Sequence, residues 1–185
     1  EWRTAWGQGD IPFLFIQLPR FETKTRYWYE LREAQYLTSH HVKNTAMVVA
    51  FDQGNPKDIH PIVKDTVGWR LSQLALGKVV CQGPEFKKMT KTADGSLLLD
   101  FANAGTGLVS KDNAATLSGF TVAGKDGKFY PAEAIIVGKN QVKVKNNLVT
   151  TPVDVRYLWV NSADMNLFNK EGFPAFPFRT DKYRL

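Results

Sequence analysis

The sequence predicts an α/β segment followed by an antiparallel β-sandwich, and two observations carry this prediction. Between residues 12 and 80, apolar runs typical of buried strands alternate with stretches of helical periodicity. After residue 84, short strand-like runs follow one another with turn sequences between them. Alternating strands and helices are typical of a parallel sheet covered by helices, whereas closely spaced short strands are typical of a β-sandwich.

Four elements are predicted before the pattern changes. Residues 12–18 and 45–51 are apolar, and both are expected to form buried strands. Residues 26–38 and 62–80 are expected to form helices, and Pro61 suits the first turn of the second because proline has no N–H to leave unbonded. The helical spacing is carried by Trp28, Leu31 and Gln35 in the first helix, and by Val63, Val67, Leu71, Leu74 and Ala75 in the second.

This α/β segment is expected to be incomplete. Parallel strands are buried on both faces and need neighbours, so two strands alone do not make a stable sheet. We therefore predict that residues 1–83 form the second half of a three-layer parallel-sheet domain. The boundary is placed at Gly83-Pro84, where the alternation of strands and helices stops.

The second segment, residues 84–185, is predicted to be a β-sandwich with an irregular C-terminal tail. Its expected strands are residues 87–92, 97–101, 119–123, 129–137, 141–145 and 153–160. The first two flank Asp94-Gly95 and the next two flank residues 125–128, so each pair predicts a hairpin. The tail, residues 166–185, is expected to be fixed to the domain surface by its phenylalanines. These are Phe168, Phe173, Phe176 and Phe178.

Composition and charge argue against several classes of protein. The 185 residues are 43% hydrophobic and 23% charged, and no apolar run approaches the roughly 20 residues that span a bilayer, so no membrane partner is expected. The net charge is +6, but Lys and Arg are scattered, so no nucleic-acid partner is expected. Cys81 is the single cysteine, which excludes an intrachain disulfide and a thiolate zinc cluster. We expect a part-buried, inert thiol there, and no cofactor or metal.

The residues best suited to catalysis are Asp58 and His60. They lie on the predicted loop between the strand 45–51 and the helix 62–80, at the carboxyl end of the sheet, where ligands and catalytic groups collect. Histidine suits proton transfer near neutral pH. A histidine base oriented by a carboxylate is the arrangement that activates a serine hydroxyl. We therefore predict that His60 is a general base and that Asp58 orients it.

Alternatives stay open for this loop. Asp52, at the end of the strand, is a second candidate for orienting His60, and Asp58 or His60 could instead cap the following helix. His40 and His41 are expected to be solvated residues at a helix C-terminus, since adjacent helical residues point about 100° apart and make poor joint ligands. No serine lies between glycines on a strand-to-helix turn, so the sequence supplies a base without an evident nucleophile.

Eleven segments, in order along the chain, carry a resemblance to a known family. They are residues 2–13, 17–18, 30–35, 58–61, 67–71, 119–120, 127–129, 131–134, 155–159, 166–172 and 177–181. They include W-G-Q-G-D at residues 6–10 and D-I-H-P at residues 58–61. Together they resemble the sialate O-acetylesterase family, which belongs to the wider SGNH-type esterases. Asn55 departs from the family pattern, which usually has Asp there.

The resemblance implies a serine esterase that removes O-acetyl groups from sialic acids or related glycans. By position, His60 matches the family's catalytic histidine and Asp58 its neighbouring carboxylate. The family's serine lies in a Gly-Gln-Ser-Asn motif, and its oxyanion donors lie in two further blocks, all upstream of the position that Glu1 matches. The chain is therefore expected to be inactive alone, with an upstream segment or a separate N-terminal chain supplying the serine. The family also implies a periplasmic or secreted location.

Three other functions remain as alternatives to a sialic acid esterase. In the first, the protein is an esterase whose substrate is an acetylated plant polysaccharide. In the second, the chain is a non-catalytic carbohydrate-binding module that uses sandwich aromatics such as Tyr130, Tyr157 or Trp159. Against this, Trp159 shares a predicted strand face with Val155 and Tyr157, so we expect it to pack in the core. In the third, the chain is a structural or interaction protein, and the loop histidine has no chemical role.

Overall fold

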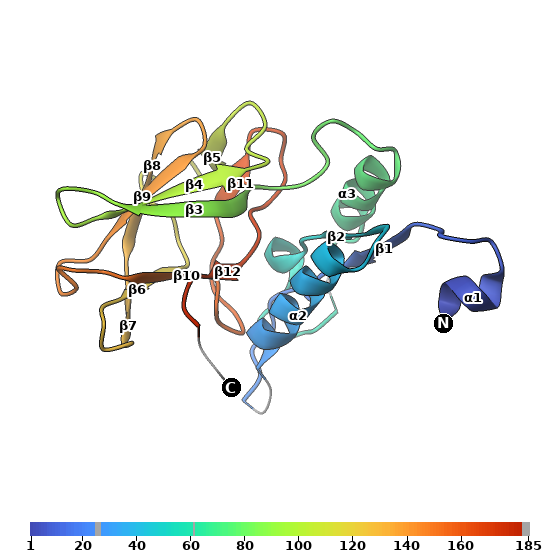
Figure 1. The fold of residues 1–185 in the computed structure, drawn as a ribbon, viewed down its shortest axis with the longest axis horizontal. Helices are drawn as coiled ribbons and strands as arrows, with labels where there is room; N and C mark the ends of the chain where they lie inside the picture. Colours follow the sequence, from blue (N-terminus) through green and yellow to red (C-terminus); the bar gives the residue numbers. More distant parts are fainter. Residues whose placement is uncertain (25–26, 61, 183–185) are drawn as a thin grey trace.

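The computed structural model describes residues 1–24, 27–60 and 62–182, with helices in its first part and strands in its second (Figure 1). The first part contains α1 (Trp2–Trp6), β1 (Phe13–Ile16), α2 (Trp28–His41), β2 (Thr45–Val48), the 3-10 turn η1 (Phe51–Gln53) and α3 (Asp65–Ala75). The predicted order strand, helix, strand, helix is confirmed. Arg26 and Pro61, which were predicted to begin the two helices, lie outside the described residues.

The helices α2 and α3 cover opposite faces of a parallel pair of strands. β1 and β2 pair in parallel, with Ile16 opposite Val48. Met47 lies in the same apolar cluster as Tyr36 of α2, whereas Val48 lies in a second cluster with Val67 of α3. Because successive side chains of a strand point to opposite faces, these two clusters lie on the two sides of β2. The arrangement is three layers deep around the pair.

The strand β1 is less buried than predicted. Phe13 and Ile16 are 39% and 41% exposed, and β1 and β2 form a two-stranded sheet among the described residues. The outer edge of β1 therefore has no neighbouring strand, although α3 packs against one face. An apolar groove of about 400 Å³ lies between residues 16–19, Ala50 and the first turns of α3.

The helix α3 is shorter than the predicted helix 62–80. It ends at Ala75, and Gly77 has a φ of +60°, which is the left-handed conformation that commonly terminates helices. The following Val79 is fully exposed, and Val63, predicted on the buried face, is 51% exposed. The helix was predicted to continue beyond Gly77 because apolar residues lie on both sides of this glycine in the sequence.

The second part contains antiparallel strands. They are β3 (Glu85–Lys91), β4 (Leu97–Ala102), β5 (Leu108–Ser110), β6 (Phe120–Ala123), β7 (Phe129–Pro131), β8 (Glu133–Gly138), β9 (Gln141–Lys145), β10 (Asp154–Tyr157), β11 (Leu167–Asn169) and β12 (Phe178–Arg179). In the described chain they form sheets of order β3-β4-β9-β8 and β12-β10-β6-β7, with a separate pair β11-β5. Buried side chains of the two larger sheets share one core, which confirms the predicted sandwich.

Two predicted strands of the sandwich are wrong in extent. The predicted strand 129–137 is divided at Ala132, because β7 pairs with β6 whereas β8 pairs with β9 in the other sheet. The predicted strand 153–160 ends at Tyr157, because Leu158 has a φ of +52° and leaves the extended conformation. The hairpin β3-β4 and the strand β9 are confirmed.

The boundary predicted at residues 83 and 84 remains a prediction, although the chain is tightly packed there. A Cβ atom at Gly83 would lie 1.8 Å from the carbonyl oxygen of Pro174, so a larger residue would force the two segments apart. The core also crosses this point, since Met47 and Phe51 join the same apolar cluster as the sandwich. The two parts therefore pack as neighbours with shared apolar contacts.

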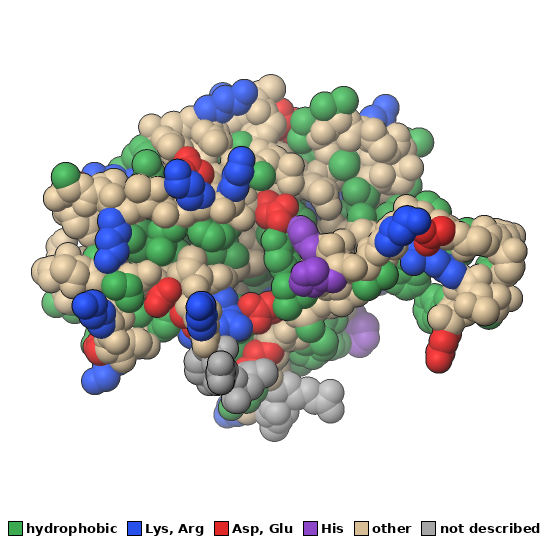
Figure 2. Space-filling view, viewed as in Figure 1, with side chains coloured by type: hydrophobic (Ala, Val, Ile, Leu, Met, Phe, Trp, Pro, Cys, Tyr) green, Lys and Arg blue, Asp and Glu red, His purple; other side chains and the backbone are tan. Residues whose placement is uncertain are grey.

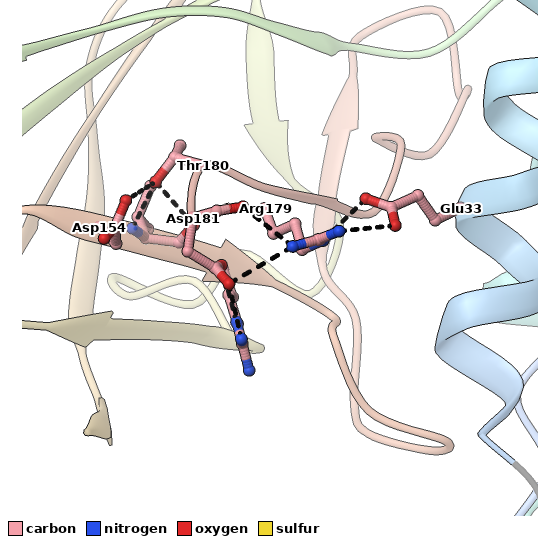
Figure 3. A network of polar contacts seen from close by, with 7 residues as sticks. Glu33, Asp154, Arg179, Thr180 and Asp181 are labelled. Carbon is pink, nitrogen blue, oxygen red and sulfur yellow. Dashed lines mark hydrogen bonds and ion pairs between the residues drawn. The ribbon is translucent and has the colours of Figure 1, made fainter. Parts of the chain in front are cut away.

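The C-terminal tail is held as predicted, and polar contacts add to its aromatic ones. Phe168, Phe173 and Phe176 are at most 3% exposed. Figure 3 shows Arg179 between Glu33 of α2 and Asp181, with Nε of Arg179 2.8 Å from the Glu33 carboxylate. Burial raises the pKa of Asp181, but Arg156 and Arg179 outweigh this effect and lower it overall. The short strands β11 and β12 of the tail were not predicted.

Candidate active site

The loop that follows β2 and η1 holds the predicted catalytic pair. It leaves the carboxyl end of the parallel pair and leads to α3, as the sequence predicted. Nδ1 of His60 lies 3.2 Å from Oδ1 of Asp58, and the backbone N–H of His60 donates to the same oxygen at 2.9 Å. A second local contact closes the loop, since the backbone N–H of Lys57 donates to Oδ1 of Asn55. The structure thus brings the two predicted residues together.

The hydrogen bonding and exposure of this pair suit an oriented base. Hydrogen bonds from the backbone and then the ring of His60 hold the pKa of Asp58 below its usual range. A charged carboxylate can only accept, so Nδ1–H of His60 donates to Asp58, and in the neutral ring Nε2 is then the acceptor. No hydrogen bond from the described residues reaches Nε2. The side chains of His60 and Asp58 are 83% and 56% exposed, so this chain by itself leaves the imidazole open.

The alternative role of this pair, capping of α3, is not observed. The N-cap of α3 is Lys64, and no side chain caps the helix there. Asp58 instead accepts hydrogen bonds from its own loop. The carboxylate is therefore committed to His60 and its backbone rather than to α3.

Asp52, the second candidate for orienting the base, has another partner. Its two carboxylate oxygens accept hydrogen bonds of 2.7 Å from Nη1 and Nη2 of Arg70 in α3. Both side chains are buried, and Arg70 also donates to the carbonyl oxygen of Val49. This buried pair fixes α3 to the end of β2, so we assign Asp52 a structural contact and keep Asp58 as the partner of His60.

The serines do not complete the site within this chain. In the described residues no serine hydroxyl hydrogen-bonds to His60. Ser39 donates to the carbonyl oxygen of Tyr36, and Ser110 donates to Asp112. That the nucleophile lies upstream of these residues remains a prediction.

The remaining histidines lie in the last turn of α2, as predicted, but His40 is not merely solvated. Its Nε2 lies 2.8 Å from the Glu85 carboxylate at the start of β3. The hydroxyl of Tyr36 donates to the same carboxylate at 2.5 Å, and burial followed by this contact raises the pKa of Tyr36. The cluster ties α2 to the sandwich. Glu85 is 45 positions from His40 and 49 from Tyr36, so local patterns could not reveal the cluster.

The aromatic residues proposed for a binding module are mostly buried. Tyr157 is fully buried, and Trp159 is 9% exposed and packs against Tyr29, with ring centroids 5.0 Å apart. Tyr130 is partly buried against the core. Tyr157 and Trp159 therefore present no open aromatic face, which weakens the binding-module alternative. Burial also raises the pKa of the Cys81 thiol, as expected for a part-buried cysteine.

The described residues contain neither a metal-binding cluster nor a membrane-spanning helix. No group of three or more His, Cys, Asp or Glu side chains is arranged to hold a metal ion. No described helix is both long enough and apolar enough to span a bilayer. Figure 2 shows Lys and Arg side chains dispersed among acidic ones on the visible face, and the described chain offers no basic patch there.

Comparison with known proteins shows that the chain is similar to part of an esterase of known structure. No protein-family model and no curated protein matches it. Among solved structures, it is similar to a carbohydrate acetylesterase from Xanthomonas citri, with a TM-score of 0.87 and 37% sequence identity. The match covers 98% of this chain and 44% of that one, so this chain spans less than half the length of the enzyme.

Proposed function

We propose that the chain is the part of a carbohydrate O-acetylesterase that supplies the catalytic base. The observation that carries the proposal is the contact between Asp58 and His60 on the loop at the carboxyl end of two parallel strands. The similarity to a carbohydrate acetylesterase over 98% of the chain supports the reaction class. His60 is the base in this proposal, and Asp58 orients it.

The chemistry follows from the free acceptor on the ring. Nε2 of His60 takes the proton of a serine hydroxyl as the serine oxygen attacks the acetyl carbonyl. Asp58 stabilises the imidazolium and keeps the proton of Nδ1 in place. The imidazolium then gives its proton to the departing sugar oxygen. In the second half-reaction His60 activates water, and acetate leaves the serine.

The serine and the oxyanion donors are proposed to come from a segment that this chain does not contain. Two observations support this: no described serine contacts His60, and the similar acetylesterase is more than twice as long. The segment is either the preceding part of the same polypeptide or a separate N-terminal chain. The α/β part is proposed to be the second half of an SGNH-type domain.

The substrate is proposed to be an O-acetylated sialic acid, with an acetylated plant polysaccharide as the alternative. The sialic acid proposal rests on the family that the sequence resembles. A location outside the cytoplasm, periplasmic or secreted, belongs to the same proposal. The comparison with the Xanthomonas citri enzyme supports an acetylated carbohydrate of either kind.

The test is acetate release by a longer polypeptide that extends upstream through the serine motif. We expect hydrolysis of O-acetylated sialic acid by the longer polypeptide and none by residues 1–185 alone. His60→Ala should lower kcat by roughly 10³-fold or more, because the base is lost. The matched control is His41→Ala, which removes an exposed histidine of α2 and should leave kcat unchanged.

Two outcomes would contradict the proposal. If residues 1–185 alone hydrolyse the ester in a manner that needs His60, the nucleophile lies within the chain. If the folded longer polypeptide releases acetate from neither sialic acid nor polysaccharide esters, the esterase assignment fails.

A further inference from the structure

A polar cleft lies between the end of β1, the end of β2 and the sandwich. It has a volume of about 340 Å³ and is lined by Arg20, Asp52, Lys111, Asp112, Ser118 and Asp164, with Met165 and Phe168. The residues come from both parts of the chain, so the cleft exists only where the sandwich meets the α/β part. Most of its lining surface is polar, unlike the apolar groove beside β1.

The cleft adjoins the loop that carries His60. Nε of Arg20, on the cleft wall, donates to the carbonyl oxygen of Gly54 at 3.1 Å. The backbone N–H of Glu22 donates to the carbonyl oxygen of Pro56 at 2.9 Å. Asp52, also on the wall, belongs to η1, which leads directly into the same loop. The cleft therefore lies at the carboxyl end of the parallel strands, on the sandwich side.

The carboxylates of the cleft are already engaged. Asp52 is held by Arg70, as described above, and Asp112 accepts from Ser110 and from the side-chain amide of Asn166. Asp164 is paired with Arg20 and is 93% exposed. The cationic groups differ in this respect.

Lys111 has unused hydrogen-bond donors. Its ammonium nitrogen lies 4.7 Å from the centre of the Phe168 ring and 3.9 Å from Oδ2 of Asp52, beyond hydrogen-bond distance. The side chain is 60% exposed, and the ammonium forms no hydrogen bond with the described residues. Arg20 uses Nε for the carbonyl oxygen of Gly54 and Nη1 for the carbonyl oxygen of Ala163 and the Asp164 carboxylate. No described group forms a hydrogen bond with its Nη2.

We infer that this cleft is the subsite for the sugar of the ester, and that Lys111 determines how tightly the sugar binds. This inference rests on the proposed esterase function. The free donors of Lys111 and Arg20 would bind oxygen acceptors of the sugar. Those acceptors are hydroxyls in a neutral sugar and a carboxylate in an acidic one. The sandwich would then contribute to substrate binding and not only to folding.

The test compares esters with and without a sugar, using the longer polypeptide that carries the serine. Lys111→Met should raise KM for an acetylated sugar roughly 10-fold, since a hydrogen bond to a charged donor is lost. It should leave kcat for that ester and all constants for 4-nitrophenyl acetate unchanged. Lys111→Arg should restore KM, because it keeps the charge. Lys125→Met, at an exposed turn of the sandwich, is the matched control and should change nothing.

The substrate arms distinguish the two kinds of acceptor. The variant Lys111→Glu is compared on an acetylated uronic or sialic acid and on a neutral acetylated oligosaccharide. If KM rises about 100-fold for the acidic substrate and less for the neutral one, Lys111 binds a carboxylate of the sugar. Equal rises indicate hydroxyls. If Lys111→Met leaves KM unchanged for every sugar ester that the unmodified protein hydrolyses, the subsite is wrong although the esterase stands. If the unmodified protein hydrolyses neither sugar esters nor 4-nitrophenyl acetate, the esterase and the subsite fail together.

Discussion

His60 is positioned by one neighbouring residue and little else. Its ring contacts Asp58 and otherwise faces solvent, with 83% of the side chain exposed. Catalytic histidines work in sites that exclude water and that hold the reacting groups in place. The open imidazole therefore agrees with a site that needs further residues from outside this chain.

Replacing Asp58 by Asn tests the orienting role directly. The pKa of Asp58 is lowered, so the carboxylate stays charged above about pH 4 and its loop contacts are lost only as the pH falls through the lowered value. Asp58→Asn in the longer polypeptide should therefore lower kcat at every pH from 5 to 8, by up to about 10⁴-fold, because the amide no longer favours the productive tautomer. The measurement is a pH–rate profile.

The control for this change is Asp126→Asn, on the exposed turn between β6 and β7. It should leave the profile unchanged. Equal kcat values for Asp58→Asn and the unmodified protein between pH 5 and 8 would remove Asp58 from the mechanism. Both variants should keep the melting temperature, since both carboxylates are exposed.

The helix α3 is fixed to the strand β2 by one buried ion pair as well as by apolar contacts. Arg70 and Asp52 are 1% and 6% exposed and form two hydrogen bonds to each other. The pair lies where η1 begins the loop that leads to His60, so the orientation of that loop depends on it. The sequence placed Arg70 on a helix and Asp52 at a strand end, but their separation of 18 residues hid the contact.

Arg70→Met should destabilise the chain strongly. The change leaves the Asp52 carboxylate buried without its partner, which typically costs about 3–5 kcal/mol of unfolding free energy. Urea denaturation followed by circular dichroism measures this. Adding Asp52→Asn to Arg70→Met should recover part of the loss, since the stranded charge is removed.

The comparison variant is Lys145→Met, whose partner Glu133 is about half exposed. It should cost less than about 1 kcal/mol, as exposed ion pairs do. Similar losses for the two single variants would mean that burial of the Arg70 pair has little energetic effect.

The whole chain distributes its apolar surface unevenly. Among the described residues, thirteen of the sixteen large hydrophobic side chains that are exposed lie before residue 84. Figure 2 shows several of the hydrophobic side chains at the surface over α3 and near α2. Exposed apolar surface next to an open strand edge is typical of contact faces, so we expect another polypeptide segment to cover it.

Residues 1–185 alone are therefore expected to self-associate. Sedimentation velocity at micromolar concentration should show species larger than a monomer. Ile16→Ser, in the apolar groove beside β1, should reduce the association, because it removes an apolar contact at the open edge. Val137→Ser, at a similarly exposed position of β8, should not. A compact monomer with a high melting temperature would contradict the expectation.

Local patterns predicted much of this molecule for physical reasons that the structure makes clear. Apolar runs and turn residues located β1, β2, β3, β4 and β9, because burial and turn chemistry act over a few neighbouring residues. The same local patterns predicted that Asp58 and His60 lie on one loop, because residues two positions apart in the segment between a strand and a helix must lie close together. Element ends were less predictable: Gly77 and Leu158 turn the chain through positive φ, and only Gly77 carried a usable sequence cue.

The tertiary structure decided what distant residues do together. Three contacts join positions that are 18 to 61 residues apart, and no local periodicity predicts them. They are the pairs Asp52–Arg70 and His40–Glu85 and the pairing of β5 with β11. The cleft around Lys111 is of this kind, because its walls come from both parts of the chain. Sequence thus determined which residue types follow each strand, whereas packing determined which of them meet, because contact free energy depends on distance in space and not along the chain.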